Sequence, residues 1–204
     1  MDSSGADKMA VVDVVVKIGG GVLAHPDHFE AALAAIGAAG RTQRLLVVPG
    51  GGPFADTIRE VAGRIRLSDD AAHWMALLAM DQYAHLVAER LADSVLVTKR
   101  HEMAAALDAP VRLVPVLAPF RWLHEADPLP HSWDVTSDSI AAWVAGQVGA
   151  RQLILVKPPG ATDAANCERV DPYFTRALLT HVRPIIISAD QIGALRAALQ
   201  ERSA

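Results

Sequence analysis

The sequence contains little that would place the chain outside the cell, in a membrane or on nucleic acid. Its one cysteine, Cys167, excludes an intramolecular disulfide framework and fits a reducing compartment. No long uncharged apolar run could span a bilayer, and the polar stretch 1–10 does not resemble a signal peptide. A net charge of −4 and a pI near 6.0 give no overall positive field for nucleic acid. We therefore expect a cytoplasmic protein that binds neither membranes nor nucleic acid.

Two familiar nucleotide-binding signatures are missing as well. The pattern G-x-G-x-x-G would require a glycine near Ala24, and no acidic residue clearly ends a second strand at the ribose position. The phosphate-loop pattern G-x-x-x-x-G-K-[ST] does not occur either. Binding of a nucleotide would therefore have to depend on other residues.

Strand and helix patterns alternate along the 204 residues, of which 51% are hydrophobic and 21% charged. Strands are predicted over 11–16, 45–48, 93–97, 111–117, 152–156 and 184–187. Helices are predicted over 29–39, 53–62, 71–91 (capped by Ser68 with Asp69 or Asp70), 102–107, 138–148, 171–180 and 191–201. This alternation predicts an α/β fold with a mostly parallel sheet between helical layers. We expect one domain over 11–204 after a loose arm over 1–10.

Prolines mark the least regular part of this pattern. Pro115 is expected to place the end of its strand at a sheet edge or a bend, because it cannot donate a ladder hydrogen bond. The stretch 120–133 holds two tryptophans and two histidines among further prolines. We predict an irregular loop there that covers another part of the molecule.

Two apolar strands run directly into glycine triplets. The first strand ends in Lys17 and then Gly19-Gly20-Gly21, and 45–48 is followed by Gly50-Gly51-Gly52. Such turns expose backbone N–H groups at the carboxyl edge of a sheet, where open α/β folds bind ligands. The two triplets predict a phosphate-rich ligand held from two sides.

Three charged residues make sense together, although each has an ordinary explanation alone. Lys17 and Lys157 each follow a buried strand, where lysines are usually solvated, and Asp138 could simply cap its helix. Phosphoryl transfer spreads negative charge over the moving group and requires fixed cations around it. Two strand-end lysines with a carboxylate between them would meet that requirement.

The order of these motifs resembles the amino acid kinase superfamily, which includes acetylglutamate, aspartate, carbamate and uridylate kinases. The motifs are Lys17-x-Gly-Gly, the second glycine triplet, DVTSDSIAAW with Asp138, the strand ending at Lys157, and Asp171-Pro172. The resemblance implies a three-layer α/β/α sandwich of the carbamate kinase-like fold. It implies an acceptor site in the N-terminal half and ATP with Mg²⁺ in the C-terminal half. Lys17 and Lys157 would stabilise the transition state, and Asp138 would orient both.

The same resemblance implies further site residues. Phosphate and acceptor contacts fall on Gly19, Gly20, Gly21, Gly50, Gly51, Gly52, Asp70, His73, Trp74 and Asp81. Nucleotide contacts fall on Lys157, Gly160, Asp171, Pro172 and Tyr173. Four of the acceptor residues, Asp70, His73, Trp74 and Asp81, belong to one predicted helix and its cap. A core, cap or solvated role is the ordinary alternative for them. No histidine has a metal-ligand spacing, so we expect no protein metal site and Mg²⁺ held mainly by phosphates.

Within the superfamily, the runs SDDAAHWMALLAMDQYAHL and WDVTSDSIAAW resemble the small branch of aminomethylfuran phosphate kinases in methanofuran-type cofactor biosynthesis. The implied reaction transfers the γ-phosphoryl group of ATP to [5-(aminomethyl)furan-3-yl]methyl phosphate and gives the diphosphate. The chain departs from larger members at Pro158-Pro159, where many relatives have a polar turn.

Two alternatives remain open at this point. One is a carboxylate or amino acid kinase that makes an acyl phosphate. The other is a non-catalytic protein of the same fold that binds a nucleotide or an oxyanion, although binding alone would not require Lys17, Asp138 and Lys157 together. A homo-oligomer is expected in each case, since the resemblance implies association.

Overall fold

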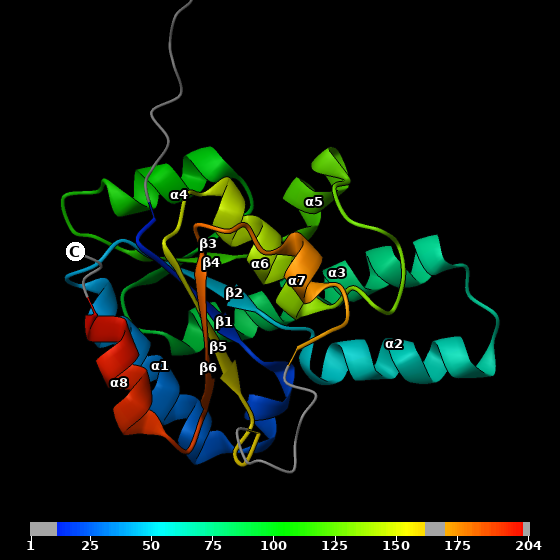
Figure 1. The fold of residues 1–204 in the computed structure, drawn as a ribbon, viewed down its shortest axis with the longest axis horizontal. Coiled ribbons are helices and arrows are strands. Elements are labelled where there is room, and N and C mark those ends of the chain that lie inside the picture. The colour runs from blue at the N-terminus through cyan, green and yellow to red at the C-terminus, as the bar shows by residue number, and fades with distance from the viewer. Residues whose placement is uncertain (1–11, 162–169, 202–204) are drawn as a thin grey trace, which may run out of the picture.

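A computed structural model describes residues 12–161 and 170–201, so the arm predicted over 1–10 and Cys167 lie outside the described residues. Within these residues the strands form one parallel sheet in the order β3-β4-β2-β1-β5-β6. The strands are β1 (Val14–Ile18), β2 (Leu45–Pro49), β3 (Ser94–Val97), β4 (Val114–Leu117), β5 (Gln152–Lys157) and β6 (Arg183–Ser188). Figure 1 shows the sheet between two helical layers, which confirms the predicted α/β/α sandwich.

The helices follow the predicted order, with two additions, a helix over 120–126 and a 3-10 helix over 20–24. They are α1 (Pro26–Gly40), α2 (Gly52–Arg64), α3 (Asp69–Arg90), α4 (Arg100–Leu107), α5 (Phe120–Ala126), α6 (Ser137–Gln147), α7 (Phe174–Ala177) and α8 (Ile192–Gln200), with a 3-10 helix η1 (Gly20–Ala24). Ser68 caps α3 by accepting a hydrogen bond from the Ala71 N–H at 3.2 Å, as predicted. Gly149, at φ +67°, follows the end of α6 in the left-handed region that glycine tolerates.

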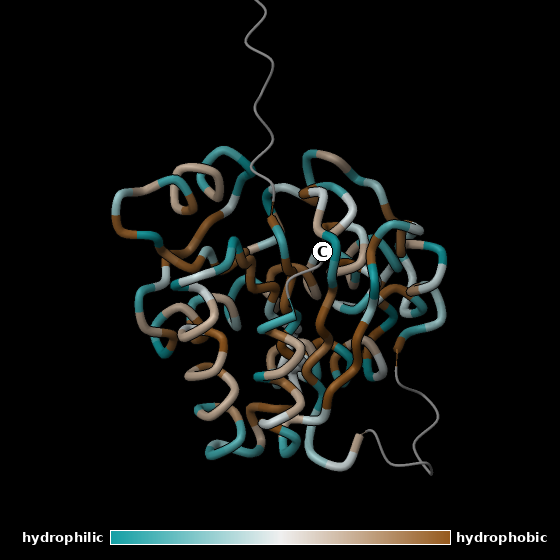
Figure 2. The backbone as a smooth tube through the Cα atoms, turned by 60° about the vertical axis from the view of Figure 1, so that its left-hand side comes forward, coloured by the Kyte–Doolittle hydropathy of each residue, from teal (hydrophilic) through white to brown (hydrophobic). Residues whose placement is uncertain are grey.

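Alternate residues of each central strand face opposite helical layers. Val14, Val16 and Ile18 of β1 pack into the cluster that holds α1 and α8, whereas Val15 packs into the cluster that holds α6. The inner strands β1, β2, β4 and β5 are buried on both faces, and Figure 2 shows the hydrophobic course of the strands through the interior. This two-sided burial explains why the strands are valine-, leucine- and isoleucine-rich runs without polar alternation.

The expected edge position of Pro115 is wrong. Pro115 lies inside β4, which runs between β3 and β2, and it pairs with Val95 of β3. The pairing of β4 with β2 is reduced to Val47 and Val116. An interior strand accommodates the missing N–H here because its ladder on that side is already short.

Two helix predictions also need correction. The first half of the stretch predicted to be an irregular loop forms α5, and Asp81 of α3 accepts a hydrogen bond from the Phe120 N–H at its start, at 2.9 Å. The helix predicted over 171–180 is limited to α7, because Asp171 is bonded elsewhere and Leu178 has an extended conformation. In the described part of the chain, no helix has the length and apolar character to cross a bilayer.

The order of the strands reverses between β1 and β5. From β1 the chain builds β2, β3 and β4 on one side and then returns to build β5 and β6 on the other. Ligands of open α/β sheets bind at such a reversal, beyond the carboxyl ends of the strands. In this chain that position lies between the ends of β1 and β5.

Candidate active site

Lys17 and Lys157 end the two strands that flank this reversal. Lys17 pairs in register with Leu155 of β5, so Lys157 lies two residues further along and on the same face of the sheet. That face is the one covered by α6. The two ammonium groups therefore point to the same side, toward the N-terminus of α6.

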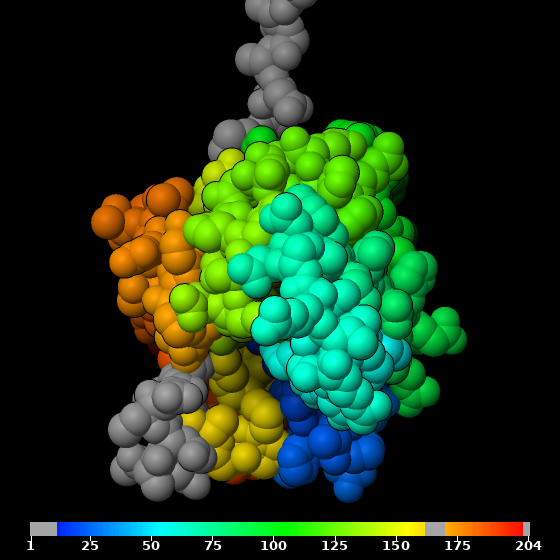
Figure 3. All heavy atoms as spheres, turned by 90° about the vertical axis from the view of Figure 1, so that its right-hand side faces the viewer, coloured from blue at the N-terminus to red at the C-terminus, as the bar shows by residue number. Residues whose placement is uncertain are grey.

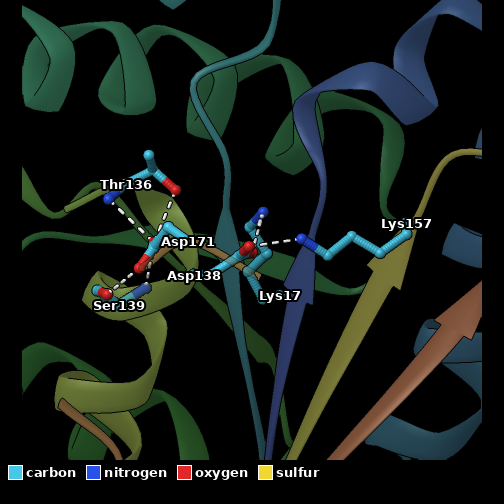
Figure 4. Close-up of polar contacts among 6 residues, drawn as sticks. All are labelled: Lys17, Thr136, Asp138, Ser139, Lys157 and Asp171. Atoms are coloured by element: carbon cyan, nitrogen blue, oxygen red, sulfur yellow. Dashed lines mark hydrogen bonds and ion pairs between the residues drawn. The ribbon is translucent and has the colours of Figure 1, made fainter. Parts of the chain in front are cut away.

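Asp138, in the first turn of α6, lies between the two lysines (Figure 4). Its Oδ1 is 2.7 Å from Lys17 Nζ, an ion pair outside hydrogen-bond geometry, and its Oδ2 accepts a hydrogen bond from Lys157 Nζ at 2.5 Å. The side chains of Lys17, Asp138 and Lys157 are only 4%, 6% and 14% exposed. Two cations thus share one buried carboxylate, which leaves the group with a net positive charge.

The titration of this group follows from burial and charge together. Burial raises the pKa of Asp138, but the charges of Lys17 and Lys157 outweigh it and hold the pKa below its ordinary value. Burial, followed by the Lys17 charge, lowers the pKa of Lys157, and the negative charges of Asp138 and Asp171 oppose that effect. The carboxylate therefore stays ionised at neutral pH.

The two glycine turns touch each other directly. A Cβ on Gly20 would come within 2.3 Å of the Gly52 backbone nitrogen, and the Gly50 N–H donates to the Ile18 carbonyl at 2.8 Å. A Cβ on Gly21 would meet the Pro158 ring at 2.7 Å, so the turn after β5 joins them. The turns form one continuous bed rather than two facing walls.

This bed fits a phosphate chain. Gly52 begins α2 at φ +57°, and the first N–H groups of a helix have no partner within it. Such N–H groups and the helix dipole favour anions. Together with the ammonium groups of Lys17 and Lys157, they provide the donors that an ATP polyphosphate needs. Among residues 12–161 and 170–201, no three His, Cys, Asp or Glu side chains gather as a metal-binding group.

A pocket adjoins this bed and is bounded by α2, α3 and the segment 132–137. Figure 3 shows this end of the molecule, with the first glycine turn in blue, the turn after β5 in yellow and the α2–α3 region in cyan. Apolar side chains lining the pocket include Leu77, Met80 and Ile140, and polar ones include Arg59, Asp69 and His73. Gly51 and Ser137 also line it, which connects the pocket to the bed and to Asp138.

His73 is a neutral member of this wall at pH 7. Burial and the neighbouring His131 lower the pKa of His73 to about 4. The two rings stack with centroids 4.2 Å apart. A neutral imidazole can donate or accept a hydrogen bond, so His73 offers polarity to the pocket without a charge.

The other acceptor residues predicted on α3 do not line the pocket. Asp70 is bonded to His131 Nδ1 at 2.6 Å, and Trp74 packs against Phe120 and His124. Asp81 accepts the hydrogen bond from Phe120 described above. The structure therefore gives these three residues structural contacts, and of the four only His73 faces the pocket.

The predicted nucleotide residues divide in a similar way. Asp171 accepts hydrogen bonds from the N–H and hydroxyl of Thr136 and Ser139, at the start of α6. The Tyr173 N–H donates to the Asp134 carbonyl at 3.2 Å, while Pro172 beside it is exposed. Gly160, at φ +76°, donates to Asp190 at 3.4 Å in the turn after β5. Only Lys157 of this set contacts Asp138 directly.

Most of the residues that line the pocket were not expected in the site, and among them are Arg59, Asp69 and Trp133. Arg59 could have been found, because Gly51, Ala55 and Arg59 recur at four-residue spacing and therefore share one face of α2. Arg59 also lies over the Trp133 ring at 5.4 Å. Trp133 reaches the pocket through an irregular segment, whose course no periodicity predicts.

Fold and site together define an α/β/α protein in which two lysines share one buried carboxylate at the reversal point of a parallel sheet. The model of the amino acid kinase family matches residues 14–158, more than half of the chain, and the chain belongs to that family. The predicted family and fold are thus confirmed.

Individual relatives agree with this assignment. The chain is 26% identical over 117 residues to the [5-(aminomethyl)furan-3-yl]methyl phosphate kinase of Methanocaldococcus jannaschii, a match that covers 55% of this chain and 51% of that protein. The chain thus matches about half the length of this relative. The uridylate kinase structure from Archaeoglobus fulgidus superposes with a TM-score of 0.65 at 15% identity, covering 93% of this chain and 96% of that one. The aspartate kinase structure from Synechocystis superposes with a TM-score of 0.55 at 13% identity, covering 87% of this chain and 38% of that one. At these identities the two structures show a shared fold.

Proposed function

We propose that this protein is an ATP-dependent kinase that phosphorylates a small molecule. The observation that carries the proposal is Asp138, which holds Lys17 Nζ at 2.7 Å and Lys157 Nζ at 2.5 Å at the carboxyl ends of adjacent strands. The chain itself fixes this pair of cations through their shared carboxylate. The pair is suited to stabilise the charge that spreads over a phosphoryl group in transfer.

The chain's own residues have distinct tasks in this reaction. When bound, ATP with Mg²⁺ supplies the phosphoryl group and the ADP leaving group. Lys17 and Lys157 neutralise charge on opposite sides of that group, and Asp138 keeps their ammonium groups in place. The glycine bed donates backbone N–H groups to the phosphates. An acceptor oxygen attacks the γ-phosphorus as the bond to the ADP oxygen breaks.

We further propose [5-(aminomethyl)furan-3-yl]methyl phosphate as the acceptor, with the diphosphate as product. The name of the Methanocaldococcus jannaschii relative supports this choice. The pocket supports it too, because its apolar side chains suit a small ring and its polar ones suit charged substituents. A phosphate acceptor is already an anion, so the reaction needs no general base.

The test is ATP consumption with Mg²⁺, with and without this acceptor, followed by product mass. We expect the acceptor to gain one phosphoryl unit, and Asp138→Ala to abolish the gain. Lys99→Ala is the matched control, because Lys99 pairs with Glu125 and lies outside the centre. Turnover that survives Lys17→Ala would refute the mechanism.

The same assay separates the alternatives. A carboxylate kinase would form an acyl phosphate, which hydroxylamine traps, whereas a diphosphate product leaves that trap blank. A protein that binds ATP but turns over none of the tested phosphates, carboxylates and amino acids would be a binding protein of this fold.

A further inference from the structure

The carboxylate of Asp171 is hydrogen-bonded to residues at the N-terminus of α6. Its Oδ2 accepts hydrogen bonds from the Thr136 N–H at 3.0 Å, the Thr136 hydroxyl at 2.7 Å and the Ser139 N–H at 2.9 Å, and its Oδ1 accepts one from the Ser139 hydroxyl. Thr136 is the N-cap residue of α6, but its own side chain caps no N–H group of the helix. A residue more than thirty positions later in the chain therefore serves as the cap.

These contacts hold the backbone on both sides of Asp138. Thr136 precedes Asp138 by two residues and Ser139 follows it directly, and both are bonded to the same carboxylate (Figure 4). A second link joins the same two segments, because the Tyr173 N–H donates to the Asp134 carbonyl. The first turn of α6 cannot rotate or slide without breaking several of these bonds.

We propose that Asp171 is a positioning residue of the phosphoryl-transfer centre, which fixes Asp138 between Lys17 and Lys157 through the first turn of α6 and adds a second negative charge on the Lys157 side. This inference rests on the proposed kinase function only for its catalytic consequence. It gives Asp171 a role through α6, in place of the nucleotide contact that the sequence predicted.

The charges around Lys157 support the electrostatic half of the proposal. Lys17 of β1 lowers the pKa of Lys157, whereas Asp138 of α6 and Asp171 of the segment before α7 raise it. Burial alone would favour the neutral amine. Asp171 thus helps to keep Lys157 in the charged form that transition-state stabilisation requires.

The substitution Asp171→Asn removes the negative charge of Asp171 and retains its hydrogen bonds to the start of α6. The asparagine oxygen can take the place of Oδ2 and accept all three of its hydrogen bonds. The asparagine NH₂ then replaces Oδ1, whose partner is the Ser139 hydroxyl, and a hydroxyl can accept as well as donate. Asp171→Ala instead removes both the charge and the cap.

The first readout is the titration of Lys157, followed by NMR of protein labelled with ¹³C-lysine. Only four lysines, at positions 8, 17, 99 and 157, contribute signals, and Lys157→Arg assigns the one of interest. We expect Lys157 to titrate at lower pH in Asp171→Asn than in the wild type. This readout requires no turnover, so it stands even if the proposed kinase activity is not found.

The second readout is kinetic. We expect the alkaline limb of the kcat profile to move to lower pH in Asp171→Asn. In Asp171→Ala we expect kcat to fall by on the order of 100-fold with little change in ATP affinity, because the reacting groups lose their alignment.

Thr136→Val with Ser139→Ala is the matched control, because it removes two hydroxyl partners and keeps the Asp171 charge. We expect this variant to lose thermal stability while Lys157 titrates as in the wild type. An Asp171→Asn protein with the wild-type Lys157 titration would overturn the proposal. A control variant that moved the titration of Lys157 as far as Asp171→Asn does would overturn it too. Neither of these two measurements requires Asp171→Ala, so they remain decisive even if that variant fails to fold.

Discussion

At the scale of single residues, the centre is an unequal group of two cations and one carboxylate. Removing Lys17 leaves Asp138 paired one-to-one with Lys157, whereas removing Asp138 takes the contacting carboxylate away from two buried ammonium groups. Breaking a buried ion pair by removing one partner costs roughly 3–5 kcal/mol. The two substitutions should therefore differ in stability, although both remove a catalytic group.

We predict that Asp138→Ala lowers the free energy of unfolding by about 3–5 kcal/mol and that Lys17→Met lowers it by much less. Urea unfolding at pH 7 measures both values, with Lys99→Met as the surface control. Equal losses for the two variants would show that the carboxylate is not the shared partner of both lysines.

The two glycine turns allow a second comparison. A Cβ on Gly52 would meet only ordinary contacts with Tyr83, but the φ of +57° costs a non-glycine residue about 1–2 kcal/mol. A Cβ on Gly20 would overlap the Gly52 backbone. We predict that Gly52→Ala folds with this modest loss, whereas Gly20→Ala displaces the turns and loses ATP binding. Thermal unfolding and ATP titration check the pair, and Gly63→Ala in open space is the control.

Residues that end a strand were predictable, and residues with distant partners were not. Lys17, Lys157 and both glycine triplets each follow an apolar run, so the sequence indicates which edge of the sheet they occupy. Asp81 and Asp171 bind backbone groups 39 and 35 positions away in sequence. No local pattern encodes such pairings, and both residues were expected at the ligand.

At the scale of elements, the segment between α5 and α6 is held to α3 by one histidine. His131 contacts Asp70 through Nδ1 at 2.6 Å and Asp127 through Nε2 at 2.9 Å. Only the imidazolium form can donate to both carboxylates at once. These hydrogen bonds, the one to Asp70 first, raise the pKa of His131 above its ordinary value.

The raised pKa of His131 makes the stability of the folded state depend on pH. A raised pKa in the folded state means that His131 contributes stability below its unfolded pKa and loses it as the pH rises through the folded pKa. We predict that His131→Gln lowers Tm more at pH 6 than at pH 9. Thermal unfolding of both proteins across this range tests it, with His101→Gln as the control. An equal Tm difference at both pH values would contradict the double contact.

Helices and strands were predicted well where the hydrophobic periodicity and the capping residues agreed. They were predicted poorly where prolines interrupted the sequence pattern. The capped α3 and four of the strands were recovered to within two residues of their ends, whereas β1 and β4 begin three residues later than predicted. The α5 helix was missed because Pro119 and later prolines suggested a loop, yet Asp81 stabilises its first turn from another helix. Pro115 was misplaced because the pairing of β4 with β2 cannot be read from β4 alone.

At the scale of the whole molecule, a chain with a net charge of −4 has its cationic centre at the reversal point of the sheet. A polyphosphate that reaches this point relieves the repulsion between the two lysines. A ligand that binds only the folded state stabilises it by about 2.7 kcal/mol at 100 times its Kd.

We predict that ATP with Mg²⁺ raises the Tm clearly more than AMP at equal concentration, because AMP lacks the phosphates that reach the lysines. Thermal shift measurements compare the two nucleotides in the wild type and in Lys17→Met, where the difference should shrink. Equal shifts by ATP and AMP would place the lysines away from the polyphosphate.

The position of β1 in the sheet has a consequence for protein synthesis. Lys17 leaves the ribosome early, but its partners on α6 and β5 are made more than a hundred residues later. Until α6 has been made, Lys17 has no contacting carboxylate, and until β5 has paired with β1, the central strand has one exposed edge. A nascent chain that stops before α6 therefore carries an unpaired lysine at the end of an unpaired strand edge. Such pieces should be the species that chaperones hold and that aggregate when translation stalls.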